Sequence, residues 1–295
     1  MSSLSIVVPR LGSDTHFEAT LASVLRYRMR HHQVIVVQSD LHADNWGLRD
    51  EVDFVEVPGR ARLARYYNEA LKAASGDTMH IVRPGVEVTH HWFAYGMRQL
   101  QKVSCGCVAA SLVSATYRDE IISRGITAGR HMLPMHVVDK RQRPLGPSSW
   151  AGFYRTCILQ AIGEVDESLS DDFLGLDLAL GIRGLGYQCG VITDRVLTIA
   201  SRQLLRCRFG HRTGRDAQRM IQRHVPRQDQ RTGAAVAFGC DLASSLWRPD
   251  RWSQLAGRFT ARQRQATDTA HSRRLAVAKH ELADALVSRN LRRAA

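Results

Sequence analysis

Short apolar runs alternate with stretches of helical periodicity over the first 200 residues of the chain. The runs are rich in valine and isoleucine, as buried strands are. They are LSIVVP (4–9), VIVVQSD (34–40), FVEV (54–57), MHIV (79–82) and CVAASLV (107–113). Between them, apolar residues recur at helical spacing near 17–25, 63–74 and 89–101. Strands that alternate with helices predict an α/β fold with a mostly parallel central sheet flanked by helices.

The rest of the chain divides into a polar segment, a second ordered stretch and a helical end. Residues 115–147 contain many turn formers and basic residues, which indicate a long surface segment. Order returns with WAGFYRTCILQAIGEVDESL and with DLALGIRGLGY, a helical pattern that Asp177 opens. From about residue 211 onward the pattern is helical again.

The net charge of +13 comes from the last third of the chain. Residues 1–200 hold 21 basic and 21 acidic side chains, whereas residues 201–295 hold 20 basic and 7 acidic ones. This change in composition predicts a boundary between an α/β domain at 1–205 and a basic helical C-terminal extension at 206–295.

An apolar stripe with basic flanks runs along the end of this extension, at Leu275, Ala278, Leu282, Ala285 and Leu286. Such a helix docks on a neighbouring domain with its charges in solvent, or it lies on an anionic bilayer. The second alternative implies peripheral membrane contact through 266–295. Nucleic-acid binding is a further alternative, which is disfavoured because the charges are spread over several helices and no reading motif is present.

Hydropathy and cysteine usage bear on the compartment. No apolar run approaches the roughly 18 residues that a membrane span requires, and the N-terminus enters an apolar strand at once. We therefore expect a cytoplasmic protein, or one that is peripheral on the inner membrane surface. Only Cys105 and Cys107 of the six cysteines are close in sequence, and no partner follows at metal-site spacing, so we expect reduced, buried thiols.

Four segments, in this order and at this spacing, resemble the family-2 glycosyltransferases with the GT-A (Rossmann-like) fold. They are LSIVVPRLGSDTHFEATLASVL, VIVVQSD, YNEALKAASGDTMHIVRPGVEV, and WAGFYRTCILQAIGEVDESL followed by DLALGIRGLGYQ. The resemblance covers about residues 3–200. Each motif is weak alone, and it is their ordered combination that is specific for the fold.

The resemblance implies transfer of a sugar from a nucleotide-diphosphate donor to a glycan or glycolipid acceptor, by an inverting single displacement. In such enzymes a divalent cation, usually Mn²⁺ or Mg²⁺, is held by an Asp-x-Asp turn and stabilises the leaving diphosphate. A carboxylate accepts the acceptor's proton as general base. The acceptor pocket is lined by the segment that here reads WAGFY.

Carried over position by position, the resemblance implies donor-binding roles for Pro9, Arg10, Gln38, Asp40, Asn68 and Arg83. The family's Asp-x-Asp turn falls on Arg83, Pro84 and Gly85, so no metal ligand is predicted. Two hypotheses follow for Arg83. Its guanidinium replaces the metal by gripping the diphosphate, or the site has lost its function and Arg83 is an exposed turn residue.

The expected acidic pair before DLALGIRGLGY falls on Leu174 and Gly175, which leaves Asp171, Asp172 and Asp177 as candidates for the base. We predict Asp172 and Asp177 as catalytic, although Asp172 could also be a solvated loop carboxylate and Asp177 a helix cap. Acceptor-binding roles are implied for Trp150, Gly152 and Arg183. An indole can stack on a sugar ring, but a core tryptophan is an equal alternative.

The sequence thus predicts a family-2-like glycosyltransferase whose acidic motifs are altered and which acts with or without a metal. The altered motifs leave a second hypothesis open, a catalytically inactive GT-A-fold protein that binds a ligand or partner. A basic protein that binds nucleic acid or a membrane surface is the third.

Overall fold

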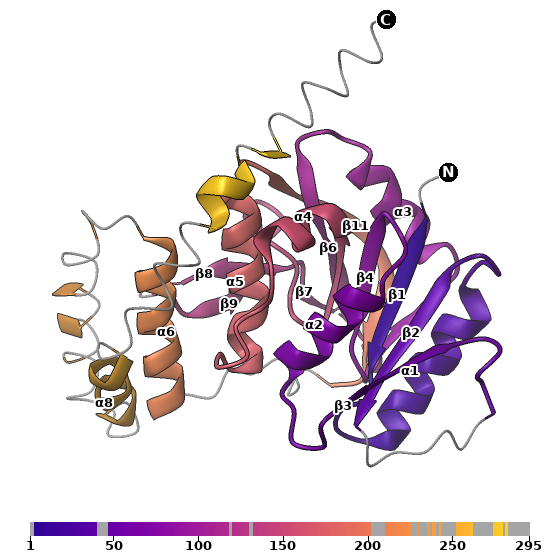
Figure 1. Ribbon diagram of the computed structural model, residues 1–295, viewed down its shortest axis with the longest axis horizontal. Helices are drawn as coiled ribbons and strands as arrows, with labels where there is room; N and C mark the ends of the chain where they lie inside the picture. The colour runs from indigo at the N-terminus through magenta and orange to yellow at the C-terminus, as the bar shows by residue number, and fades with distance from the viewer. Residues whose placement is uncertain are drawn as a thin grey trace, which may run out of the picture.

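The computed structural model describes residues 3–39, 47–117, 120–129, 132–201, 210–225, 252–261 and 274–279, together with a few shorter pieces between 229 and 282. The described part of the chain forms a three-layer α/β structure with a curled central sheet, from which the C-terminal helices extend on one side (Figure 1).

The central sheet contains nine strands among the described residues, and six of them run in the same direction. In spatial order they are β3 (Asp53–Val57), β2 (Gln33–Ser39), β1 (Leu4–Pro9), β4 (Thr78–Val82), β10 (Ala151–Arg155), β6 (Cys105–Ser114), β11 (Gln188–Ile199) and β5 (Val86–Val88), while β7 (Ile121–Ser123) pairs with β6 off this path. Strands β5, β7 and β10 run antiparallel to their partners. The predicted α/β fold with a mostly parallel sheet is confirmed.

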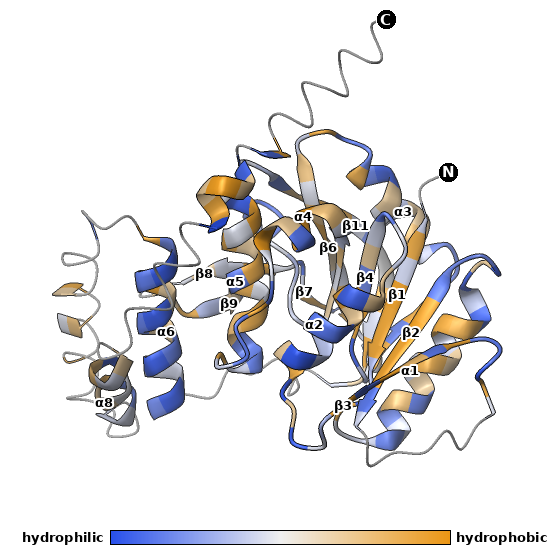
Figure 2. Ribbon diagram, in the orientation of Figure 1, coloured by the Kyte–Doolittle hydropathy of each residue, from blue (hydrophilic) through white to orange (hydrophobic). Residues whose placement is uncertain are grey.

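Helices cover both faces of the sheet, so the strands are buried on both sides and read as continuous apolar runs. One face carries α1 (Asp14–Tyr27) and α3 (Trp92–Leu100), and the other carries α2 (Leu63–Ala73), α4 (Thr156–Ile162) and α5 (Asp171–Gly184). Hydrophobic residues concentrate on the strands and on the helix faces that pack against them (Figure 2).

The segment 115–147 is more ordered than the sequence predicts. It contains β7 and the antiparallel pair β8 (Ile126–Ala128) and β9 (Pro134–His136). Ile122, Arg124 and Val137 within it are at most 5% exposed. The prediction of a surface segment is therefore wrong in part, because runs of only three residues are too short to show the periodicity of a strand.

The C-terminal extension packs on the α/β domain. Helix α6 (His211–His224) lies against α5, and α8 (Trp252–Ala261) lies against α6. A Cβ added to Gly214 would meet the backbone carbonyl of Gln254, and one added to Gly257 would meet that of His211, so these glycines permit the close approach of α6 and α8. The predicted boundary near residue 205 falls between β11 and α6.

The apolar stripe of the extension docks rather than facing solvent, as far as the described residues show. Ala278 is buried in the same core as α5, and Leu275 and Leu282 pack against that core. This contact favours the docking alternative over membrane contact for these three positions; Ala285 and Leu286 lie outside the described residues. No described helix has the length and apolar character needed to cross a bilayer.

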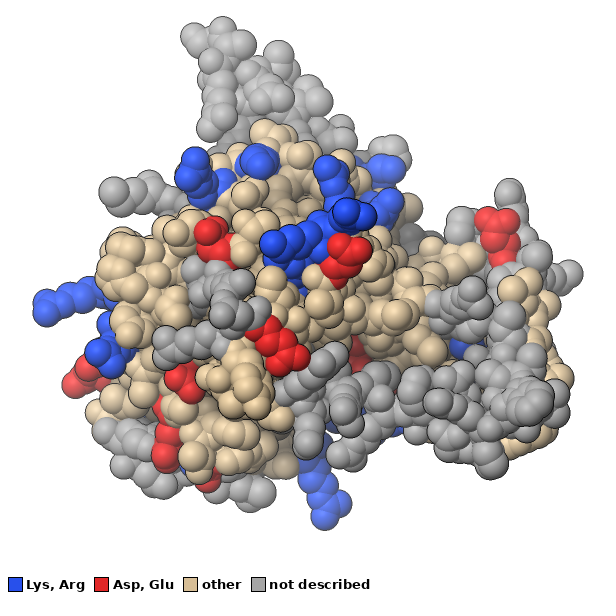
Figure 3. Space-filling model, turned by 180° about the vertical axis from the view of Figure 1, so that it is seen from behind, with Lys and Arg blue, Asp and Glu red and all other residues tan. Residues whose placement is uncertain are grey.

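The cysteines and the surface charge can also be compared with the sequence predictions. Cys105 and Cys107 are buried in β6 as expected, whereas Cys157 is exposed; Cys207 and Cys240 lie outside the described residues. Seen from behind, the molecule gathers Lys and Arg side chains near the centre of its upper half, with single acidic side chains beside them (Figure 3). Among the described residues, positive charge on this face is therefore concentrated locally.

Candidate active site

A pocket of about 680 Å³ opens at the edge of the sheet where β1 and β4 end. We call it the edge pocket. It is lined by the beginnings of α1, α2, α5 and α6, by the turn after β4 and by Trp150 ahead of β10. Its size is that of a small-molecule site, and open α/β sheets bind ligands beyond the carboxyl ends of their strands.

Three of these four helices have their N-cap residue in the pocket wall: Ser13 of α1, Arg62 of α2 and Ser170 of α5. None of the three has a hydrogen bond from its own side chain to the first turn. Gly12 precedes α1 with a φ of 84°, a left-handed conformation that glycine adopts without strain. Unpaired backbone N–H groups and the helix dipole make such N-termini favourable places for anions.

Arg83 lies at the centre of this edge, directly after β4. Its backbone N–H donates to the Trp150 carbonyl at 2.9 Å, and its own carbonyl accepts from Val86 across the Arg-Pro-Gly turn at 3.0 Å. Gly85 has a φ of 94° and donates its N–H to the Thr20 hydroxyl at 3.0 Å. Backbone hydrogen bonds thus hold the turn to Trp150 and to Thr20 of α1, which fixes the position of the Arg83 Cα.

The Arg83 guanidinium is held in place but makes few hydrogen bonds. Its carbon lies 4.1 Å from the Trp150 ring centre, a cation–π contact. Nη1 donates to the Ser149 hydroxyl at 3.4 Å, Nη2 lies 3.7 Å from the Asp171 carboxylate, and Nε is buried without a hydrogen-bond partner among the described residues. Because a guanidinium has five N–H donors, most of the capacity of Arg83 is unused.

Tyr67 supports the segment on which Arg83 rests. Its hydroxyl donates to the Ser149 carbonyl at 2.6 Å, and the side chain is buried at 3% exposure. Burial raises the pKa of the Tyr67 phenol above its ordinary value, so it stays a neutral donor. Tyr67 thereby fixes the backbone just ahead of Trp150.

Asp171 and Asp172 form the acidic side of the edge pocket. Helix α5 begins at Asp171, so both side chains belong to its first turn. The prediction that Asp177 opens this helix is wrong, because Ser170 caps it and the apolar pattern continues upstream through Phe173 and Leu174. Acidic side chains in a first turn are favoured by the helix dipole.

Asp177 lies in the middle of α5, 3% exposed and outside the edge pocket. Its carboxylate accepts two hydrogen bonds from Arg223, at 3.1 and 3.2 Å, and a third contact from His224 at 2.7 Å. These partners belong to α6, so Asp177 joins the two helices and does not face a substrate.

The predicted donor residues behind the pocket have contacts of their own. Pro9 ends β1 and is buried, and Arg10 donates to the carboxylate of Asp14 at 3.2 Å. Gln38 is 3% exposed and accepts from Arg10 at 3.5 Å. The Asn68 side-chain amide donates to the Val165 carbonyl at 3.1 Å and accepts from the Val165 N–H at 2.7 Å. None of these four lines the edge pocket, and Asp40 lies outside the described residues.

Two of the predicted acceptor residues also lie away from the pocket. Gly152 is inside β10, where its carbonyl contacts Nδ1 of the buried His80 at 3.0 Å. Burial lowers the pKa of His80 to about 3, so this imidazole is neutral. Arg183 is exposed in the last turn of α5, about 16 Å along the helix axis from Asp172.

The edge pocket therefore brings together three predicted residues, Arg83, Trp150 and Asp172, together with Asp171. It also contains His16, Arg62 and Arg212, which sequence reasoning did not select. Arg62 and Arg212 follow no motif; Arg62 is the N-cap residue of α2 and Arg212 is the second residue of α6, so their nearness to the pocket depends on tertiary packing.

The residues at the expected metal position do not suit a divalent cation. An arginine, a proline and a glycine stand where Asp-x-Asp would supply two carboxylates. Within the described ranges, no group of three or more His, Cys, Asp or Glu side chains is arranged to hold a metal ion. The donor set of the edge pocket instead favours an anionic ligand.

The sheet order, the flanking helices and the pocket at the carboxyl edge define the GT-A-like fold of glycosyltransferases. No protein-family model matches the sequence, and no curated protein matches it.

Similar solved structures include GalNAc-T7 with UDP, GalNAc and Mn²⁺, at a TM-score of 0.55 and 15% identity over 68% of this chain and 43% of that one. Residues 1–349 of Staphylococcus aureus TarS match with a TM-score of 0.55 and 13% identity over 80% of this chain and 69% of that one. A mannosyltransferase from Pyrobaculum calidifontis, solved with GDP-Man and Mn²⁺, matches with a TM-score of 0.51 and 16% identity over 90% of this chain and 87% of that one. The chain thus spans less than half the length of GalNAc-T7, and the likeness is one of fold.

Proposed function

We propose that the chain is a glycosyltransferase that binds the diphosphate of a nucleotide-sugar in the edge pocket and uses Arg83 in place of a metal ion. The observation that carries the proposal is the incompletely hydrogen-bonded guanidinium of Arg83 at the tip of β4. Two solved structures of similar fold contain UDP or GDP-Man, each together with Mn²⁺. The acceptor we propose is a glycan or glycolipid.

The charge of the edge pocket supports an anionic ligand without a cation. Its described lining residues include three guanidinium groups, from Arg62, Arg83 and Arg212, and two carboxylates, from Asp171 and Asp172. Three helix N-termini add roughly half a positive charge each. This surplus offsets the two negative charges of a bound diphosphate, whereas an Asp-x-Asp site would require a cation to reach the same balance.

The proposed reaction is a single displacement at the anomeric carbon. The acceptor oxygen forms the new C–O bond while the bond from the anomeric carbon to the diphosphate oxygen breaks. Asp172 takes the acceptor's hydroxyl proton as general base, and the electron pair of the broken bond leaves with the diphosphate. Arg83 and the helix N-termini stabilise the charge that grows on that leaving group.

Metal independence belongs to the same proposal. A planar guanidinium can bind two phosphate oxygens at once, and the contact with Trp150 already orders the group, so less side-chain entropy is lost on binding. Asp171 limits the strength of the grip, because its carboxylate competes for Nη2 of Arg83 at 3.7 Å.

A thermal-shift panel of UDP-, GDP- and dTDP-sugars, each with EDTA and with Mn²⁺, tests the proposal. At least one nucleotide-sugar should raise the melting temperature equally under both conditions, and product analysis of that mixture should show hydrolysis or transfer. Stabilisation that requires Mn²⁺ would contradict the role of Arg83, and no stabilisation by any donor would contradict the function itself.

The second candidate function is a GT-A-fold binding protein without catalysis. It is favoured by the positions of the acids, because Asp171 is engaged with Arg83 and Asp177 is buried against α6. Such a protein would be stabilised by a nucleotide-sugar but would leave it intact in the presence of any acceptor.

A further inference from the structure

The face of α6 that packs on α5 is charged, although faces buried between helices are usually apolar. Figure 2 shows α6 as largely hydrophilic. Arg215, Arg219 and Arg223 recur at intervals of four residues and lie on one side of the helix, with Asp216 beside them. Arg219 and Arg223 are each 7% exposed, and Asp216 is fully buried. Charges buried in this way persist only when they are paired.

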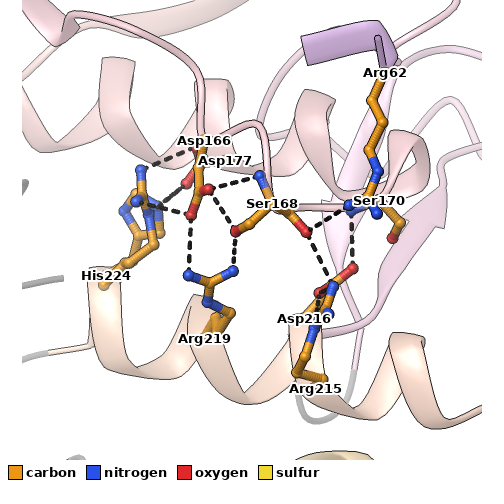
Figure 4. A network of polar contacts seen from close by, with 10 residues as sticks. Arg62, Asp166, Ser168, Ser170, Asp177, Arg215, Asp216, Arg219 and His224 are labelled. Atoms are coloured by element: carbon orange, nitrogen blue, oxygen red, sulfur yellow. Dashed lines mark hydrogen bonds and ion pairs between the residues drawn. The ribbon is translucent and has the colours of Figure 1, made fainter. Parts of the chain in front are cut away.

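Every one of these side chains contacts α5 or the loop that leads into it (Figure 4). At the far end, Arg223 and His224 bind Asp177 in the middle of α5. Further along α6, Arg223 and Arg219 lie 3.4 and 3.6 Å from one oxygen of Asp166. We call this set of contacts the α5–α6 network.

Hydrogen bonds of Ser168 hold the loop that precedes α5. Asp166 accepts hydrogen bonds from the Ser168 backbone and hydroxyl at 2.9 and 2.5 Å, which closes a tight local turn. The hydroxyl also contacts Arg219. The Ser168 carbonyl accepts from Arg215 at 2.9 Å and from Arg62 at 3.4 Å, so α6 and the start of α2 meet on one peptide group.

The end of the network nearest the edge pocket is Asp216. One of its oxygens accepts the backbone N–H of Ser170, the N-cap residue of α5, at 2.8 Å. The other accepts from Arg215 at 2.8 and 3.0 Å. In a capping box the N-cap N–H is bound by an acidic side chain three residues later in the same helix. That position in α5 is the apolar Phe173, so the helix cannot supply the carboxylate itself.

We infer that Asp216 is a positioning residue, which supplies the carboxylate of a capping box to α5 from another helix. It thereby fixes the direction of the first turn, where Asp171 and Asp172 face the edge pocket. The same docking brings Arg212, one turn earlier in α6, to the pocket wall. The C-terminal extension is on this account part of the active site, an inference that rests on the proposed function for its catalytic consequence.

Two substitutions of Asp216 separate positioning from bulk stability. Asp216→Asn keeps an oxygen that can accept the Ser170 N–H, and Arg215 is 31% exposed, so water can solvate its unpaired charge. Asp216→Leu removes the acceptor at similar size. Val24→Ala is the stability control, because it shortens a fully buried side chain on the opposite face of the sheet.

Hydrogen–deuterium exchange and binding of UDP and GDP in EDTA are measured for the three variants and the unaltered chain. In Asp216→Leu, we expect exchange over residues 169–173 to rise about tenfold and the affinity for the bound nucleotide to fall about fivefold to tenfold. Asp216→Asn should restore both values to within about threefold of the unaltered chain. Val24→Ala should leave exchange at 169–173 and nucleotide affinity unchanged.

The inference is overturned if Asp216→Leu behaves like Val24→Ala in exchange at 169–173, or if Asp216→Asn fails to restore that exchange. Amide exchange requires no ligand, so it decides the positioning role by itself. If the unaltered chain binds neither UDP nor GDP nor any donor of the thermal-shift panel, the proposed function fails separately.

Discussion

Arg83 and Arg223 are both largely buried arginines beside aspartates of α5, with side chains 13% and 6% exposed. All three nitrogens of Arg223 reach a carboxylate, at 3.1, 3.2 and 3.4 Å. Arg83 has one hydrogen bond of 3.4 Å, one ion pair of 3.7 Å and a buried Nε that has no partner in the described part of the chain.

The difference is that the hydrogen bonds of Arg223 are satisfied within the fold, whereas those of Arg83 are incomplete among the described residues. A buried hydrogen-bond donor normally has an acceptor, and leaving it without one costs about 1–3 kcal/mol. Arg223 avoids that cost because its donors are paired within the fold. Breaking these pairs should therefore lower the free energy of unfolding. On the proposed function, an anion in the edge pocket would supply the missing acceptors of Arg83, so replacing Arg83 should weaken binding more than it lowers stability.

The largest expected effect comes from breaking the satisfied pair. Asp177→Ala leaves Arg223 buried with one of its two acidic partners missing, and it should lower the free energy of unfolding by about 3–5 kcal/mol in urea denaturation. Asp14→Ala is the matched control. Its carboxylate also pairs with an arginine but is 60% exposed, so a loss of less than about 1 kcal/mol is expected. Equal losses in the two variants would remove the distinction.

Within α5, the acids at the pocket should behave differently from Asp177. Asp172→Asn should lower turnover of the donor that the thermal-shift panel identifies by about 10²–10⁴-fold, since it removes the proposed base, while donor affinity stays within about twofold. Asp171→Asn should instead raise the affinity for the donor, because the Asp171 carboxylate competes with the diphosphate for Arg83. Unaltered turnover in Asp172→Asn would exclude this residue as the base.

Removing the unsatisfied arginine should affect binding more than stability. Arg83→Ala should weaken UDP or GDP by about 10–100-fold in isothermal titration, the equivalent of losing a charge-assisted pair of hydrogen bonds. The affinity of Arg83→Lys, which keeps the charge but not the planar guanidinium, should lie between those of the unaltered chain and Arg83→Ala. Arg98→Ala, in α3 on the opposite face of the sheet, controls for a general loss of positive charge. A variant without Arg83 that bound normally would place the diphosphate elsewhere.

The smallest effect should come from the support behind Arg83. Tyr67→Phe removes the hydroxyl that binds the Ser149 carbonyl and should cost about 1 kcal/mol of unfolding free energy. Nucleotide affinity should fall by less than about threefold, because Arg83 keeps its backbone bond to Trp150. A loss of affinity as large as in Arg83→Ala would mean that Tyr67, and not the unused donors of Arg83, controls the site.

The strands were predictable because they are buried on both faces and therefore appear as unbroken apolar runs. The runs at 4–9, 34–40 and 79–82 correspond closely to β1, β2 and β4. The strands within 115–147 are not evident from the sequence because they are only three residues long. The pattern predicts the start of α5 six residues late, because the glycine and acidic residues upstream of Asp177 mask a helix whose N-cap is bound by another helix.

The candidate site was predictable only where a residue directly follows or precedes a strand, or begins a helix that the sequence marks. Arg83 and Trp150 stand next to β4 and β10, so fold and position together indicate them. Asp177 looked catalytic because its partners, Arg223 and His224, are 46 and 47 residues further along the chain. Arg62 and Arg212 lie at the pocket through the packing of α2 and α6, and no local pattern encodes that placement.

On the proposed function, Arg83 takes the place of a metal ion at the diphosphate. Isothermal titration of the unaltered chain with the preferred nucleotide-sugar, once in EDTA and once in excess Mn²⁺, tests it most directly. The two dissociation constants should agree within about twofold. Binding that appears only with Mn²⁺, or that tightens more than about tenfold with it, would contradict the claim.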